Sequence, residues 1–250
     1  MPQQSTEYDA NLNLGLLLVG EPGDGKTRTA LAFRSLSDES ALPYLIDFDN
    51  NLGSAIRKLD PRPDFLYDVA SKADDGSEVP LPLRWELLEK RLKAAVLNPK
   101  VGAIIIDSLD PLCDALIAHI CRKQGVPEMR IKDWGSFKTM LKTLVMFLRA
   151  SSKITVITTH QGAEKDEVTG AITYNPTMPG SLKYNFGGFF TDVWACEAKS
   201  VGQSLKYLIH PLPKVRSVKL KNSFGLDKPL EVTDMRPAQV WNLIKSQLTK

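Results

Sequence analysis

Residues 14–33 read LGLLLVGEPGDGKTRTALAF, and this stretch decides the fold. The apolar run over residues 14–19 has the composition of a buried strand, and apolar residues at helical spacing follow over residues 30–33. Between them, residues 20–27 spell GEPGDGKT, which matches the phosphate-binding pattern GxxxxGK[ST] in its required position after a strand and before a helix. The sequence therefore predicts an α/β protein that binds a nucleoside triphosphate rather than a glycine-rich turn that binds nothing.

The residue types of this loop fit the chemistry of a bound triphosphate. Its glycines let the backbone wrap closely around phosphate, so that N–H groups at the positive end of a helix dipole point at the anion. We predict that Lys26 neutralises the β and γ phosphates and that the Thr27 hydroxyl ligates Mg²⁺. A carboxylate repels phosphate, so we expect Asp24 to point outward, towards a neighbouring subunit. The predicted ATP contacts are Gly20, Glu21, Pro22, Gly23, Asp24, Gly25, Lys26, Thr27 and Arg28.

Composition limits the class of protein. A chain of 250 residues with 43% hydrophobic residues suits one globular α/β domain, and a formal net charge of +3 does not by itself indicate a nucleic-acid partner. Basic residues are concentrated in 199–228, which is either a solvated face or a binding surface. The three cysteines lack metal-binding spacing, and no apolar run has the length of a membrane span. We expect a cytoplasmic protein with reduced thiols and no membrane partner.

Apolar patterns along the chain predict alternating strands and helices. Further strands are expected at residues 43–49, 101–106, 154–159, 192–196, 206–210 and 215–220. Further helices are expected at 50–59, 85–96, 137–148 and 237–248, with irregular surface at 60–82 and a polar loop at 162–180. This alternation predicts a mostly parallel sheet with helices on both faces. We divide the chain into a flexible arm (1–11), an ATPase core (12–233) and a C-terminal helix (234–250).

Polar side chains follow three of the predicted strands, at the edge where ligands bind in open α/β sheets. Asp107 ends an apolar strand and is the candidate Mg²⁺ ligand, with capping of the next helix as the alternative. Asp49 is the candidate general base for the attacking water, and Asp47 competes for this role because strand alternation places it on the same face. His160 ends a third strand and is a candidate contact of the γ phosphate, with a purely structural histidine as the alternative.

Taken in order, these motifs resemble the RecA-type P-loop ATPase core over roughly residues 12–225, and they are similar to phage-encoded, core-only RecA-like proteins that anneal single strands. IDFD at 46–49 resembles the strand that ends in the water-activating carboxylate of that family, which favours Asp49 over Asp47. IIIDSL at 104–109 resembles the Mg²⁺-binding strand with its following turn.

The same resemblance leaves the γ-phosphate sensor open. In the family a glutamine reports the γ phosphate to the DNA-binding loop. Here VITTHQ at 156–161 offers His160 at the corresponding place, with Gln161 next to it. Both residues therefore remain candidates.

The resemblance also implies sites for DNA and for a neighbouring subunit. The first DNA-binding loop of the family corresponds to residues 117–134, and NPTMPGSLKY at 175–184 resembles the end of the second. RSVKLKNSF at 216–224 resembles a basic strand that reaches the ATP of a neighbour, which makes Lys219 and Lys221 the candidates for acting in trans. The implied DNA-binding residues are Arg122, Lys123, Arg130, Lys132, Lys183 and Tyr184.

What the resemblance implies as a whole is an ATP- and Mg²⁺-dependent, DNA-stimulated ATPase that binds single-stranded DNA in recombination or strand annealing. The implied partners are single-stranded DNA, further copies of the chain in a ring or filament with ATP at the subunit interface, and a single-strand binding protein. The implied location is the cytoplasm, that of the host if the protein is phage-encoded. The residues leave open a helicase- or loader-like ATPase of DNA replication, and a regulatory nucleotide-binding protein or kinase without DNA contact.

Overall fold

The computed structural model describes residues 14–57, 63–165, 167–170, 172–211 and 220–248. The predicted arm at 1–11, nearly all of the predicted strand at 215–220 and the candidate Lys219 lie outside these ranges. Within them, no helix is both long enough and apolar enough to cross a membrane.

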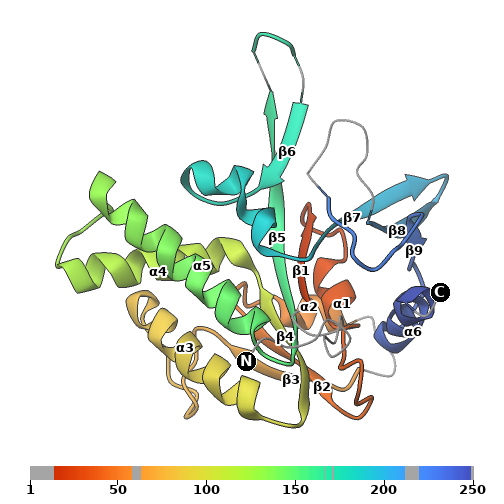
Figure 1. Cartoon of the computed structure of the whole chain (residues 1–250), viewed down its shortest axis with the longest axis horizontal. Helices are drawn as coiled ribbons and strands as arrows, with labels where there is room; N and C mark the ends of the chain where they lie inside the picture. Colours follow the sequence, from red (N-terminus) through yellow and green to blue (C-terminus); the bar gives the residue numbers. More distant parts are fainter. Residues whose placement is uncertain (1–13, 58–62, 166, 171, 212–219, 249–250) are drawn as a thin grey trace, which may run out of the picture.

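A nine-stranded sheet organises the described chain (Figure 1). Its strands are β1 (Gly15–Gly20), β2 (Leu42–Asp47), β3 (Leu66–Val69), β4 (Val101–Asp107), β5 (Ile154–Lys165), β6 (Ile172–Pro176), β7 (Asp192–Val201), β8 (Ser204–His210) and β9 (Leu230–Glu231). Their order is β3-β2-β4-β5-β1-β7-β8-β9, and β6 pairs with β5 outside this path. Neighbours from β3 to β7 are parallel, whereas β6, β8 and β9 are added antiparallel. The carboxyl ends of β1, β2, β4 and β5 therefore meet at one edge of the sheet.

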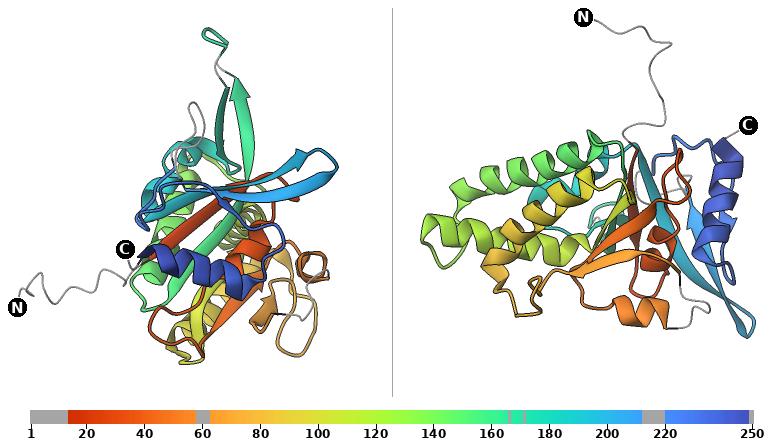
Figure 2. Two further views of the ribbon diagram at one scale, coloured as in Figure 1. Left: turned by 90° about the vertical axis from the view of Figure 1, so that its right-hand side faces the viewer. Right: turned by 90° about the horizontal axis from the view of Figure 1, so that it is seen from below.

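Helices cover both faces of this sheet (Figure 2). One face carries α3 (Leu81–Leu97), α4 (Leu109–Gln124) and α5 (Trp134–Arg149), and the other carries α1 (Lys26–Ala30), α2 (Leu52–Ile56) and α6 (Pro237–Leu248). Strand alternation feeds both layers: Leu17 packs under α3–α5, whereas Leu16 and Leu18 pack under α1 and α6. The predicted α/β class, a mostly parallel sheet with helices on both faces, is confirmed.

Two segments predicted as irregular form regular structure. Residues 66–69 within the predicted irregular stretch form the edge strand β3, which pairs with β2. α3 begins at Leu81 rather than at Trp85, because prolines next to a helix start lose no helical hydrogen bond. At the neighbouring site, β2 ends at Asp47, so Asp49 lies in the turn that follows.

The two predicted DNA-binding loops also differ from expectation. β5 continues past Thr159 to Lys165 and pairs with β6, so the predicted polar loop at 162–180 is largely a β-hairpin that projects from the sheet (Figure 1). Both of its faces are largely exposed, which removes the apolar alternation that identifies a half-buried strand. The predicted loop at 117–134 is half helical, because α4 extends to Gln124 and the short helix η2 (Ile131–Asp133) precedes α5.

Candidate nucleotide-binding site

The loop between β1 and α1 has a backbone that glycine makes possible. Gly23 and Gly25 adopt φ values of 91° and 79°, in the left-handed region that side chains with a Cβ rarely enter. A Cβ on Gly25 would also lie 3.1 Å from the ring of Tyr207, which β8 places over the loop. The loop therefore turns tightly into the first turn of α1, as the sequence pattern predicts.

The expectation for Asp24 is wrong. Its Oδ2 accepts the backbone N–H of Glu21 at 2.6 Å, and its Oδ1 accepts the N–H of Ala198 in β7 at 2.9 Å. The carboxylate thus ties the phosphate-binding loop to β7 of its own chain instead of pointing outward. Two backbone donors satisfy the charge, so it lies beside an anion site without facing it.

Lys26 lies at the centre of the carboxyl edge. Its side chain is buried, and its Nζ donates to the carbonyls of Gly20 at 3.0 Å and Glu21 at 2.9 Å. The same Nζ is 3.3 Å from Nδ1 of His160. Burial lowers the pKa of Lys26, and the nearby carboxylates oppose that shift. The amine is therefore held at the loop, where it can meet a phosphate oxygen.

Thr27 and Asp107 form the oxygen pair that a Mg²⁺ site requires. Thr27 Oγ1 donates to Asp107 Oδ2 at 2.7 Å, and Thr158 Oγ1 donates to the other carboxylate oxygen. Desolvation raises the pKa of the buried Asp107, and these two hydrogen bonds oppose the rise. No cluster of three His, Cys, Asp or Glu side chains among the described residues could hold a metal ion by itself. Two protein oxygens instead suit Mg²⁺, which keeps several waters and takes further oxygens from a phosphate substrate.

Asp47 and Asp49 have different surroundings. Asp47 is buried, and its two oxygens accept the backbone N–H groups of Asn51 and Leu52, where α2 begins. Asp49 is exposed to a cavity, and Ser108 Oγ donates to its Oδ1 at 3.0 Å. Loss of hydration raises the pKa of both carboxyl groups. Asp47 is thus occupied by the helix start, whereas Asp49 is free to meet a water molecule.

The structure separates His160 from Gln161. The His160 side chain reaches Lys26, whereas Gln161 lines a different hollow next to Glu21. Asp110, in the first turn of α4, accepts the backbone N–H of His160 at 3.2 Å. Asp110 is not among the residues predicted from the sequence, because its bond to His160 joins two segments 50 residues apart.

A cavity of about 480 Å³ joins these groups at the carboxyl edge. Its lining combines the phosphate-binding loop with the ends of β2, β4 and β5 and the start of α2: Pro22, Gly23, Gly25, Lys26, Thr27, Arg28, Asp49, Asn51, Ser54, Ala55, Asp107, His160 and Tyr207. Tyr207 comes from a strand about 180 residues after the loop, so no local pattern identifies it. The cavity therefore brings together the predicted phosphate-binding, Mg²⁺-binding and water-activating residues.

The predicted DNA-binding residues lie elsewhere, and most of them form ion pairs within the chain. Arg122 and Lys123 both pair with Glu86 of α3, at 2.6 and 3.0 Å. Arg130 pairs with Asp133 at 2.8 Å.

On the hairpin side, Glu164 accepts from both Lys183 and Tyr184. Among the trans-acting candidates, Lys221 Nζ donates to the carbonyl of Phe190 at 3.0 Å, within its own chain. Lys132 is exposed, and its side chain has no ion pair to any described residue. Of the DNA-binding and trans-acting candidates that the structure describes, all except Lys132 thus have a partner within the chain.

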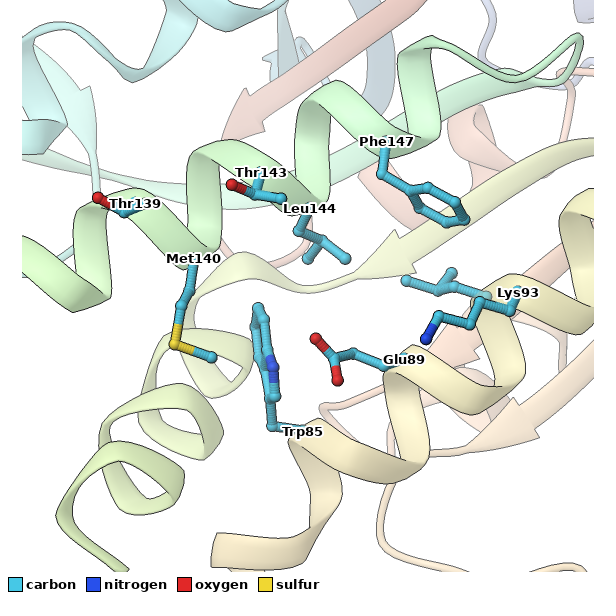
Figure 3. A pocket seen from close by; sticks show the side chains of 9 residues that line it. Trp85, Glu89, Lys93, Thr139, Met140, Thr143, Leu144 and Phe147 are labelled. Atoms are coloured by element: carbon cyan, nitrogen blue, oxygen red, sulfur yellow. The ribbon is translucent and has the colours of Figure 1, made fainter. Parts of the chain in front are cut away.

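A second cavity, of about 280 Å³, lies between α3 and α5 on the face away from α1 (Figure 3). Its lining is mostly apolar, with Trp85 and Leu92 from α3 opposite Met140, Leu144 and Phe147 from α5. Glu89 and Lys93 are the charged members of its lining, and both come from α3. This cavity has no phosphate-binding loop and is separate from the nucleotide cavity.

A family of known proteins matches most of the chain. The sequence pattern of a family described as an AAA domain matches residues 12–219, which contain every residue that lines the nucleotide cavity. Among solved structures, the chain is similar to a KaiC-like protein from the hyperthermophilic archaeon Pyrococcus horikoshii OT3, with 14% sequence identity and a TM-score of 0.46. That similarity covers 91% of this chain and 88% of the other. No curated protein matches the chain.

Proposed function

The chain belongs to the AAA domain family, and from this premise we propose that it is a Mg²⁺-dependent ATPase. The observation that carries the proposal is the 2.7 Å hydrogen bond between Thr27 and Asp107 beside the Lys26 amine. A hydroxyl and a carboxylate next to a lysine on a phosphate-binding loop are the groups that hold Mg²⁺ and the terminal phosphates of a nucleotide.

Each side chain has a separate role in this reaction. Water attacks the γ phosphorus, the bond to the β–γ bridging oxygen breaks, and Asp49 accepts the proton that the water loses. Lys26 stabilises charge on the phosphate oxygens, and the His160 ring next to it faces the same phosphate. Thr27 and Asp107 would hold Mg²⁺, which when bound would supply further positive charge to the phosphate oxygens.

We propose further that a second copy of the chain completes the site. Asp49 and Asp107 both line the cavity, whereas Lys26 is the one lysine among its described lining residues and Arg28 is bonded to the carbonyl of Met235. A cation from a neighbouring subunit would offset this excess of negative charge. Because Lys221 is bonded to its own Phe190 carbonyl, Lys219 is the favoured donor of the pair.

Mixing variants tests this shared site. Lys219→Ala and Lys26→Ala proteins, each inactive alone, should regain phosphate release when combined, because mixed interfaces contain one intact site. No recovery in proteins shown to co-assemble would contradict a subunit-shared site.

For the finer function we propose binding of single-stranded DNA, in annealing or recombination. Support comes from β5, which runs without a break from His160 at the cavity to Glu164 at the hairpin. Beside the hairpin, Tyr184 is half exposed, and Lys183 Nζ lies 5.1 Å from its ring centre. An exposed aromatic suits stacking on a base, and Lys183 would reach a phosphate by exchanging its ion pair with Glu164 for one with the DNA.

Stimulation of phosphate release by a single-stranded oligonucleotide tests the DNA proposal. A rise in turnover with single-stranded DNA and none with duplex supports it. Strand displacement instead of annealing would favour a helicase- or loader-like ATPase, and no response to DNA at low salt would leave a regulatory ATPase.

The ATPase itself is tested by Asp107→Asn, with and without a chelator. Wild-type phosphate release should stop when Mg²⁺ is chelated, and the variant should lose about 10²-fold or more in turnover because one Mg²⁺ ligand loses its charge. Asp114→Asn, on the exposed side of α4, is the matched control and should match wild type. Equal turnover of Asp107→Asn and wild type would contradict the assignment.

A further inference from the structure

We infer that Asp110 is a positioning residue, whose carboxylate holds β5 at His160 so that the His160 imidazole stays beside Lys26. The inference rests on the proposed ATPase function and adds a residue to its site. Asp110 is half-buried, and it is the only acidic residue in the first turn of α4. Its own side chain does not line the nucleotide cavity, so it acts through His160 rather than on the nucleotide.

The sheet topology explains why β5 needs this support. β4 pairs with β5 only as far as Ile157, because the chain then turns into α4, whereas β1 continues alongside β5 to His160. Residues 158–160 of β5 therefore have no partner in β4, and β6 pairs with β5 only from Gln161 onward. Asp110 Oδ2 takes the place of that partner: it accepts the His160 N–H at 3.2 Å and lies 3.4 Å from the donating Thr159 hydroxyl.

The other backbone group of His160 is also fixed. Its carbonyl accepts the N–H of Thr177, just after β6, at 2.9 Å. Because the N–H and the C=O of His160 both have a hydrogen-bond partner, the backbone from which the imidazole extends is held in place. The ring Nδ1 lies 3.3 Å from Lys26 Nζ. Without the carboxylate, the partly buried N–H would lose its acceptor, and β5 would shift at His160 to find another. The ring would then move relative to the γ-phosphate end of the cavity.

Partial burial makes this position energetically unfavourable for a carboxylate. A carboxylate at such a position is expected where it has a function. Partial burial raises the pKa of Asp110, and the hydrogen bond from His160 opposes that shift. An apolar residue at this position of α4 would avoid the desolvation cost but would leave the His160 N–H unpaired.

Steady-state kinetics of three variants test the inference. Asp110→Ala should lower kcat by about tenfold, comparable to the loss of one hydrogen bond, and leave KM for ATP within about twofold, because the phosphate-binding loop is untouched. Asp110→Asn should restore most of kcat, because its amide oxygen still accepts the N–H. Asp114→Ala, one turn further along α4 and exposed, is the matched control. If the alanine variant does not fold, Asp110→Glu, which displaces the carboxylate by one methylene group, replaces it with the same expected loss.

A double-mutant cycle separates positioning from a general structural role. In a His160→Ala background, Asp110→Ala should change kcat little, because the ring it positions is gone. Full additivity of the two effects, or an Asp110→Asn variant as slow as Asp110→Ala, would overturn the inference.

Nuclear magnetic resonance of the imidazole groups gives a readout that does not need turnover. The chain contains three histidines, His119, His160 and His210, and the His160→Ala variant identifies the signal of interest. Asp110→Ala should shift the His160 ring signal and leave the other two in place. An unchanged His160 signal would overturn the inference even if the protein hydrolyses ATP. Conversely, a shifted signal in a protein without turnover would keep Asp110 as a positioning residue and reject only the ATPase.

Discussion

At the carboxyl edge of the sheet, charged side chains face a cavity; on α4 and the β5–β6 hairpin, they face one another. Lys26 and Asp49 both line a hollow of about 480 Å³. Arg122 and Lys183 instead form ion pairs with Glu86 and Glu164. A basic residue in a sequence shows only that a charge is present. Whether that charge is available to a ligand depends on whether the fold gives it an acidic partner within the chain. We therefore expect substitutions in the two regions to have different effects on ATP turnover and on the salt dependence of DNA binding.

The largest expected difference lies within the carboxyl edge, between its two neighbouring carboxylates. Asp49→Asn should lower kcat by about 10²–10⁴-fold and spare ATP binding, because an amide cannot accept the proton of the attacking water. Asp47→Asn should keep turnover within about threefold, because an amide oxygen still accepts an N–H at the start of α2. Single-turnover phosphate release measures both. A slow Asp47→Asn with a normal Asp49→Asn would reverse the assignment.

A second prediction for the carboxyl edge concerns Tyr207 and the affinity for ATP. The ring of this residue covers Gly25, and Tyr207 lines the cavity together with Arg28. If it stacks on the base, Tyr207→Ala should weaken ATP binding by about tenfold, and Tyr207→Phe should not. Fluorescence titration with an ATP analogue measures this. Equal affinity in all three proteins would place the base elsewhere.

The salt dependence of DNA binding tests whether an exposed lysine and an ion-paired arginine differ as DNA contacts. Removing one cation that neutralises a phosphate of a single strand should reduce the log–log salt slope by about 0.7. Lys132→Ala should show this reduction, because Lys132 is exposed and has no ion pair among the described residues. Arg122→Ala should leave the slope unchanged, because Arg122 is bound to Glu86. Fluorescence anisotropy with a labelled oligonucleotide measures the slope for each variant. Equal slopes for Lys132→Ala and Arg122→Ala would contradict the expected difference between a paired and an unpaired cation.

The smallest expected effect is the titration of Glu164. The hydrogen bond from Lys183 lowers the pKa of Glu164, whereas burial raises the pKa of Asp49 at the carboxyl edge. A carboxyl group with a lowered folded pKa stabilises the fold above its unfolded pKa, about 4.3 for glutamate, and this contribution is lost as the pH falls through the folded pKa. Lys183→Gln should return the Glu164 pKa to its ordinary range. Carbon resonance titrations measure it, and an unchanged midpoint would show that the pair does not persist in solution.

Local patterns predicted several of the residues that meet at the carboxyl edge of the sheet. The phosphate-binding loop is defined within eight residues by backbone demands that glycine meets, and Asp107 follows a run of buried apolar residues. The structure places both at one cavity with His160, as strand order in an α/β sheet requires. The roles of these residues remain predictions.

What sequence reasoning missed depends on interactions between distant segments. Asp24 bonds to β7 and Tyr207 comes from β8, and neither partner is visible from the loop itself. The β5–β6 hairpin was predicted as a loop because its strands are exposed on both faces and carry no apolar alternation. The ion pair between Arg122 of α4 and Glu86 of α3 joins two residues that are 36 positions apart in the sequence, so a count of basic residues could not reveal it.

Calorimetric titration of ATP with Mg²⁺ into wild type and Lys26→Ala tests the central claim most directly. Lys138→Ala, an exposed lysine of α5, is the matched control for removal of one positive charge. The account predicts that wild type and Lys138→Ala bind ATP alike, whereas Lys26→Ala binds at least about tenfold more weakly with its fold intact, because no charged amine then meets the phosphate. Equal ATP affinity of Lys26→Ala and wild type would contradict the assignment of the carboxyl edge as the nucleotide site.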